Sequence, residues 1–118
     1  MIIKFIGSVI LGTLLLEAKS CDKKNVSDVP SCIQQMITDF QAKPVQNPPA
    51  SIYQYDFNGQ QVYYVTAPCC DFFSDLYDQN CVLIAHPDGG FTGKGDGKAA
   101  DFSKTRTNEK LIWKDERN

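Results

Sequence analysis

The dipeptide Asn58-Gly59 constrains the fold of this chain more than any other feature. It joins two runs rich in aromatic and β-branched residues, 52–57 and 60–66, and Asn-Gly is the strongest short signal for a two-residue hairpin turn. Such a turn sets the strand register and places Phe57 opposite Gln60. Because side chains alternate along a strand, one face of the predicted hairpin carries five apolar side chains, namely Tyr53, Tyr55, Phe57, Val62 and Tyr64.

A helix is predicted before the hairpin, because apolar residues recur there at spacings of three and four. This apolar stripe consists of Val29, Ile33, Met36, Ile37 and Phe40, and Pro44 marks its expected end. We expect the aromatic face of the hairpin to pack on the stripe, and a binding surface of exposed tyrosines is the alternative. A third strand is predicted over 81–85, a fourth, edge-type strand over 110–114, and a turn or short helical piece over 72–78. The predicted fold class is α+β: one N-terminal amphipathic helix packed on a small antiparallel sheet with an Asn-Gly hairpin, supported by disulfides.

The first twenty residues have the order of an export signal. Lys4 precedes an uncharged apolar run over 5–16, and the small residues Ala18 and Ser20 stand before Cys21. The run is about a dozen residues, too short to cross a bilayer as a helix. We therefore predict a signal peptide over 1–20, a flexible tether over 21–29 and a single α+β domain over 30–118. We favour cleavage before Cys21 and lipidation of this cysteine. The alternatives are simple secretion and a buried N-terminal core helix.

A lipid on Cys21 would anchor the protein to a membrane, facing the periplasm or the cell surface. Four cysteines then remain, an even number that suits a disulfide framework outside the cytoplasm: Cys32, Cys69, Cys70 and Cys81. A bridge between neighbours needs a strained backbone. We therefore expect Cys69 and Cys70 to pair separately, one with Cys32 and the other with Cys81, each bridge contributing about 2–4 kcal/mol.

The segment 86–98 is rich in glycine and is the candidate binding loop, with Asp88, Gly89, Gly90, Phe91, Gly93, Lys94 and Asp96 as its candidate residues. It is not a Walker A loop, because Asp96 stands where that motif requires lysine. Asp88, Asp96 and Asp101 could together supply oxygen ligands to Ca²⁺, the one cofactor that the sequence suggests. The net charge is −2 for the chain and −3 after removal of 1–20, which gives no attraction to nucleic acid.

Catalysis is not predicted from the residues. The chain has a single histidine, His86, and an enzyme would need it beside an unpaired Cys69 or Cys70. We assign no catalytic residue. The leading hypothesis is a non-enzymatic binding or structural module of the cell envelope that binds a protein or small ligand through the loop and neighbouring aromatic residues. A calcium-dependent binding domain using 88–101 and an envelope enzyme using His86 are the alternatives.

Several motifs carry a resemblance to a known family: Cys69-Cys70-Asp71, Leu76-Tyr77-Asp78, the run from Pro87 to Gly97, Asp101-Phe102 and the run from Ile112 to Arg117. Over about Pro30 to Arg117 the chain resembles an uncharacterised family of small lipoproteins from Gram-negative bacteria, a domain of unknown function. The resemblance therefore implies no catalytic residue. It also implies that relatives carry cysteines where this chain has Ala85 and Ala99, so that a loop-closing bridge is missing here.

Overall fold

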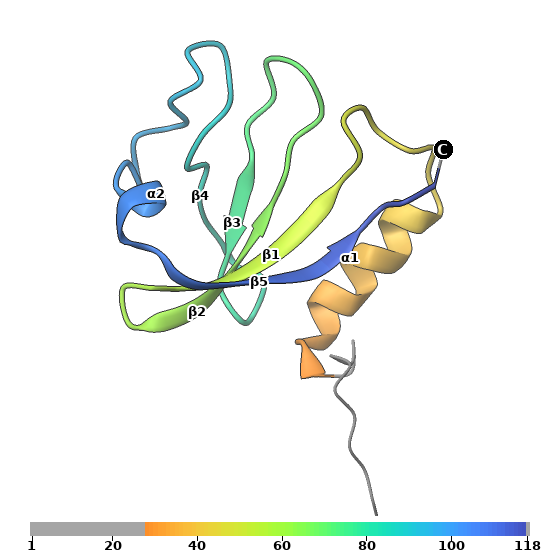
Figure 1. Cartoon of the computed structure of the whole chain (residues 1–118), viewed down its shortest axis with the longest axis horizontal. Helices are drawn as coiled ribbons and strands as arrows, with labels where there is room; N and C mark the ends of the chain where they lie inside the picture. The colour runs from red at the N-terminus through yellow and green to blue at the C-terminus, as the bar shows by residue number, and fades with distance from the viewer. Residues whose placement is uncertain (1–27, 118) are drawn as a thin grey trace, which may run out of the picture.

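A computed structural model describes residues 28–117 as one helix, a five-stranded antiparallel sheet and a short second helix (Figure 1). The sheet has the order β4-β3-β2-β1-β5. The predicted α+β class is therefore confirmed. In chain order the elements are α1 (Ser31–Gln41), β1 (Ser51–Phe57), β2 (Gln60–Val65), β3 (Asp75–Tyr77), β4 (Leu83–Ala85), α2 (Phe102–Thr105) and β5 (Thr107–Lys114).

The predicted signal peptide and the lipidation site Cys21 lie outside the described residues, as does most of the predicted tether. Within 28–117, no helix is both long and apolar enough to span a membrane.

The Asn-Gly hairpin forms with the predicted register. Phe57 pairs with Gln60, and Tyr53 pairs with Tyr64, across the turn between β1 and β2. Asn58 and Gly59 both have positive φ, at 50° and 79°, the backbone conformation that this turn requires. The last strand also forms as expected, because β5 pairs with β1 at one edge of the sheet.

The helix packs on the opposite face of the hairpin from the one expected. Its stripe contacts Ile52, Tyr63 and Val65, which lie at the open end of the hairpin away from the Asn-Gly turn. These three apolar residues are the part of the face that the short helix covers. The polar residues of the same face, Gln54, Asp56 and Gln61, lie outside the cluster under the helix. The expectation was wrong because α2 and the chain leading into it cover the aromatic face instead.

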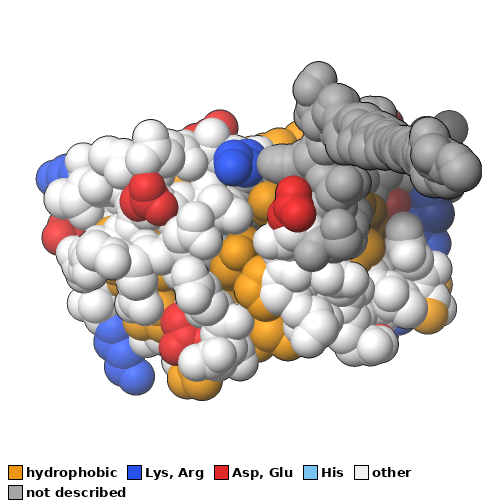
Figure 2. All heavy atoms as spheres, turned by 90° about the horizontal axis from the view of Figure 1, so that it is seen from below, with side chains coloured by type: hydrophobic (Ala, Val, Ile, Leu, Met, Phe, Trp, Pro, Cys, Tyr) orange, Lys and Arg blue, Asp and Glu red, His pale blue; other side chains and the backbone are white. Residues whose placement is uncertain are grey.

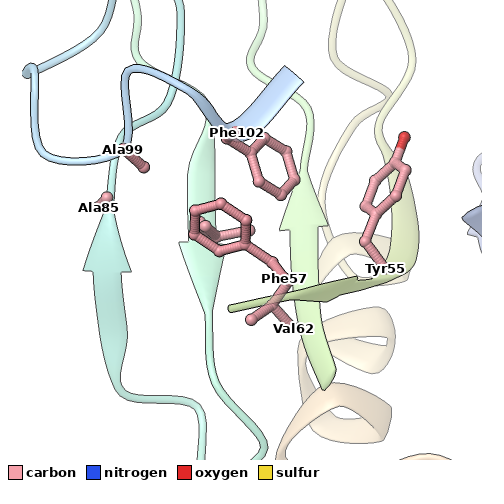
Figure 3. Packing of buried hydrophobic residues seen from close by; sticks show 7 residues of the cluster. Tyr55, Phe57, Val62, Ala85, Ala99 and Phe102 are labelled. Carbon is pink, nitrogen blue, oxygen red and sulfur yellow. The ribbon is translucent and has the colours of Figure 1, made fainter. Parts of the chain in front are cut away.

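The aromatic face is covered by α2 and the chain leading into it. Phe102 is 1% exposed, and its ring centroid lies 5.3 Å from that of Tyr55 and 5.1 Å from that of Phe57 (Figure 3). The guanidinium of Arg106 lies 4.5 Å from the centre of the Tyr55 ring, a cation–π contact. The sheet is thus a middle layer, with a hydrophobic cluster on each face.

The segment predicted as a turn or helical piece contains a strand instead. β3 pairs with β2 through Tyr63–Tyr77 and Tyr64–Leu76, so Leu76 enters the cluster under Phe102. A strand of three residues is too short to show a period in the sequence, and pairing with β2 stabilises it. The predicted strand over 81–85 forms as the shorter β4.

The predicted cysteine pairing is also wrong. Cys32 at the start of α1 pairs with Cys81 in the turn between β3 and β4, and Cys69 pairs with Cys70. The physical reason is the placement of α1 on the sheet, which brings its first turn to the β3–β4 turn, with 6.2 Å between the two Cα atoms. That end of the molecule is seen in Figure 2.

The other end of α1 is closed by the C-terminal segment. The guanidinium of Arg117 donates to the carbonyls of Phe40 and Gln41, both at 3.1 Å. These are carbonyls of the last turn, which have no partner within a helix. The same guanidinium binds the buried Asp115 carboxylate at 2.7 and 2.8 Å, so β5 and α1 are joined at this point.

Candidate functional site

The glycine-rich loop between β4 and α2 lies against the 66–74 segment, at the top of Figure 1. The amide of Ser74 donates to the carbonyl of Asp88 at 3.1 Å, and the amide of Gly90 donates to the carbonyl of Phe72 at 3.0 Å. Within the loop, the amide of Asp96 donates to the carbonyl of His86 at 2.9 Å. Hydrogen bonds therefore hold the loop at its base and across its neck, and it is an ordered structure.

Two glycines allow this close packing. A Cβ atom at Gly95 would overlap the carbonyl oxygen of His86, and one at Gly90 would overlap the Phe73 ring. Both glycines have positive φ, at 72° and 76°, which other residues adopt at a cost. The loop conformation thus depends on glycine at these positions.

The Asp88 carboxylate is the centre of a hydrogen-bond network below the loop. The hydroxyl of Tyr64 donates to it at 2.8 Å, and the hydroxyl of Ser74 donates to it at 2.7 Å. Ser74 is only 1% exposed. Burial, and then the hydrogen bond to Asp88, raise the pKa of Tyr64 to about 12. Asp88 therefore fixes the loop to β2 and to the start of β3.

His86 is held by three neighbours. Its Nδ1 lies 2.9 Å from a carboxylate oxygen of Asp75 and 3.0 Å from the carbonyl of Ser74, and its ring stacks on Phe73 with centroids 4.7 Å apart. Both neighbours of Nδ1 are acceptors, so Nδ1 carries a proton and donates. The imidazole thus ties the first residue after β4 to β3.

The loop and its neighbour expose three phenylalanines. Phe91 is 90% exposed, Phe72 60% and Phe73 43%. They lie on two adjacent segments, because Gly90, which precedes Phe91, is bonded to Phe72. We call Phe72, Phe73 and Phe91 the phenylalanine surface. Exposed aromatic rings on a fixed scaffold are typical of contact surfaces for other molecules.

The structure does not bring Asp88, Asp96 and Asp101 together as a group of metal ligands. Among residues 28–117, no three His, Cys, Asp or Glu side chains are placed to hold a metal ion. Asp88 is engaged by Tyr64 and Ser74, and Asp96 accepts the amide of Lys98 at 3.0 Å in an Asx-turn. Asp101 stands at the start of α2. Asp88 and Asp96 thus hold the conformation of the loop itself.

The envelope-enzyme hypothesis required a free thiol near His86. Cys69 and Cys70 are paired with each other, and paired sulfurs are not nucleophiles. The nearest groups to the imidazole are instead an acid, a carbonyl and a phenyl ring. The structure thus gives His86 a positioning role in the loop.

A surface hollow lies at the hairpin, away from the loop. It measures about 550 Å³ and is lined by Asp56, Gly59, Gln60, Gln61 and Gln79. Ligand sites are mostly apolar and enclosed, with a few polar groups, whereas every side chain lining this hollow is polar. It is the part of the sheet face that α1 leaves uncovered.

Sequence reasoning identified the loop residues but missed the side chains that hold and extend the site. Tyr64 lies on the aromatic face of the predicted hairpin and Ser74 in the predicted turn or helical piece, so the sequence predicts for neither a bond to the loop. Phe72 and Phe73 were placed in a turn or helical piece. The adjacent pair Phe72-Phe73 was the one available signal, since two neighbouring large apolar residues in a turn are unusual.

These features define the class of protein: a disulfide-linked α+β domain that presents an ordered glycine-rich loop. Residues 38–115 match a family described as a domain of unknown function (DUF6970), and the chain belongs to that family. The match includes the whole sheet down to β5, the loop and α2, and it begins within α1. Neither the comparison with curated proteins nor that with solved structures finds a match.

Proposed function

We propose that this protein is an exported, lipid-anchored domain of the cell envelope that acts as a binding module through the phenylalanine surface. The observation that carries the proposal is Phe91, 90% exposed on a loop that hydrogen bonds hold in one conformation. The backbone that carries this ring is already ordered and loses little conformational freedom on binding. Burial of the ring by a partner therefore contributes nearly its full free energy to the affinity.

The partner we propose is an envelope protein with an apolar pocket for Phe91. Aromatic anchors seated in pockets dominate protein–protein binding energies, and the rest of the interface is mostly polar. Phe72 and Phe73 extend the apolar contact, and Asp71 and Lys94, which are close to the phenylalanines in the chain, supply polar groups. A ring that is 90% exposed suits insertion into a partner better than enclosure of a small molecule.

The anchor is proposed from the sequence. The early Lys4, the apolar run over 5–16 and the small residues before Cys21 form the order of an export signal. The Cys32–Cys81 disulfide supports the proposal, because such bonds persist in oxidising compartments outside the cytoplasm. Intact mass of protein from the membrane fraction measures the lipid directly, and an unmodified Cys21 would refute the anchor.

The binding surface is tested by photo-crosslinking in the host cell. An aromatic photo-crosslinker replaces Phe91 in one variant and the exposed Lys110 of β5 in a matched control. We expect a discrete adduct with an envelope protein from position 91 and none from position 110. An equal pattern from both positions would contradict a specific surface.

A second variant measures the affinity for the partner identified in this way. Phe91→Ala is expected to weaken binding by about 2 kcal/mol, roughly 30-fold, because the ring is the proposed anchor. Its midpoint of thermal unfolding should equal that of the wild type, since a side chain 90% exposed contributes little to the folded state. Undiminished binding by this variant would exclude Phe91 as the anchor.

A further inference from the structure

The end of the domain at which α1 begins carries an exposed apolar turn. Val82 is 58% exposed and Leu83 46% exposed. The disulfide between Cys32 and Cys81 fixes this turn beside the first turn of α1. Figure 2 views this end of the molecule and shows hydrophobic side chains gathered on it. An apolar surface therefore lies where the chain enters the domain.

The turn is preformed. The backbone amides of Asn80 and Val82 donate to one oxygen of the Asp78 carboxylate, at 2.8 and 3.0 Å. The amide of Asp78 in turn donates to the carbonyl of Val82 at 3.0 Å. Val82 is therefore displayed by an ordered turn, and the acidic group nearest to it already has backbone partners.

The exposed large apolar residues are divided mainly between the two ends of the domain. Phe72, Phe73 and Phe91 lie at the loop end, and Val82 and Leu83 lie where α1 begins (Figure 1). β4 runs between these two ends, since its first residue follows the turn and its last precedes the loop. A surface touching one end therefore leaves the other free.

The chain leading to α1 determines what can lie against the turn. From Cys21 to Val29 it advances eight residues, which reach at most about 28 Å when fully extended. A lipid on Cys21 would hold the turn within that distance of the bilayer. Lys23 and Lys24 follow Cys21 and add cations that favour anionic headgroups.

We propose that Val82 and Leu83 rest on the bilayer that holds the lipid of Cys21. The inference rests on the anchor proposed above and adds an orientation to it: the domain stands on its α1 end and presents the phenylalanine surface away from the membrane. Anchoring makes this second contact intramolecular, so two apolar side chains are enough to bias the orientation. Stable membrane attachment commonly combines a lipid with a second signal of this kind.

Fluorescence quenching by brominated lipid tests the contact. The full lipidated chain is purified from membranes and reconstituted into phospholipid vesicles with brominated acyl chains. Trp113→Phe removes the one native tryptophan and keeps a ring to stack on Phe40. In this background, a Val82→Trp variant reports on the turn and a Phe91→Trp variant reports on the loop. We expect about twofold quenching at position 82, as for a ring at the acyl boundary, and none at position 91.

The outcomes distinguish failure of the orientation from failure of the anchor. Lipid on Cys21 with no quenching at position 82 overturns the orientation and leaves the anchor standing. Quenching at position 91 also overturns the orientation, because the loop would then contact the bilayer. An unmodified Cys21 overturns the anchor and this inference together. A Leu83→Trp variant repeats the measurement at the neighbouring position if Val82→Trp fails to fold.

Discussion

Replacement of Gly95 or Gly97 by alanine separates the cost of a glycine backbone conformation from the cost of close packing. Both glycines have positive φ, at 72° and 83°. A Cβ at Gly97 meets nothing within 4 Å, whereas a Cβ at Gly95 overlaps the carbonyl oxygen of His86. Gly97→Ala is therefore a matched control for Gly95→Ala, with the same backbone penalty and no collision.

The expected magnitudes follow from the contacts. Alanine in the left-handed region costs about 1 kcal/mol, and this applies to both variants. Gly95→Ala must also move the loop off His86, which breaks the bonds from Gly95 to Gly89 and from Asp96 to His86. At about 1 kcal/mol for each bond, the difference between the two variants is about 2 kcal/mol. The loss of freedom in the unfolded chain is the same for both and cancels.

Urea unfolding followed by Trp113 fluorescence measures the free energy of unfolding of both variants. In thermal unfolding, Gly97→Ala should lower the midpoint by about 4–8 °C and Gly95→Ala by roughly three times as much. Hydrogen exchange at the Asp96 amide reports the same effect locally, because that amide donates to His86. If both variants lost the same free energy of unfolding and hydrogen exchange at the Asp96 amide were unchanged, the close packing of the loop on His86 would be refuted.

Two further predictions concern the base of the loop and its edge. The pKa of Tyr64, raised to about 12, means that its stabilising contribution is complete below pH 10 and is lost as the pH rises towards 12. Tyr64→Phe should lower the free energy of unfolding at pH 7 by about 1.5–3 kcal/mol. It should also lessen the decline of this free energy between pH 10 and 12, to which Tyr77 still contributes, and an unchanged decline would contradict the raised pKa of Tyr64. Ala85 and Ala99 are buried in the same hydrophobic cluster (Figure 3). The double variant Ala85→Cys, Ala99→Cys should form a bridge worth about 3 kcal/mol over either single variant, measured by thermal unfolding with intact mass, and a double variant with two free thiols would show that the positions do not meet.

The candidate loop could be found from the sequence because its composition is local information. Five glycines within 86–98 and the aspartates among them indicated an irregular, closely packed segment. The role of those aspartates could not be found in this way. Asp88 meets Tyr64 and Ser74 from two other strands or segments, so its engagement depends on the folded arrangement.

The sequence alone determined the elements whose signals are local: the Asn58-Gly59 hairpin with its register, the apolar stripe of α1 and the α+β class. Turn geometry and side-chain periodicity act over a few residues and are legible in one chain. Only the tertiary structure decided which face of the hairpin α1 covers, that Phe102 covers the other, and that Cys32 pairs with Cys81. Both faces near the open end of the hairpin are apolar, so either could have received the helix. The choice depends on contacts between residues far apart in the chain, which no local pattern records.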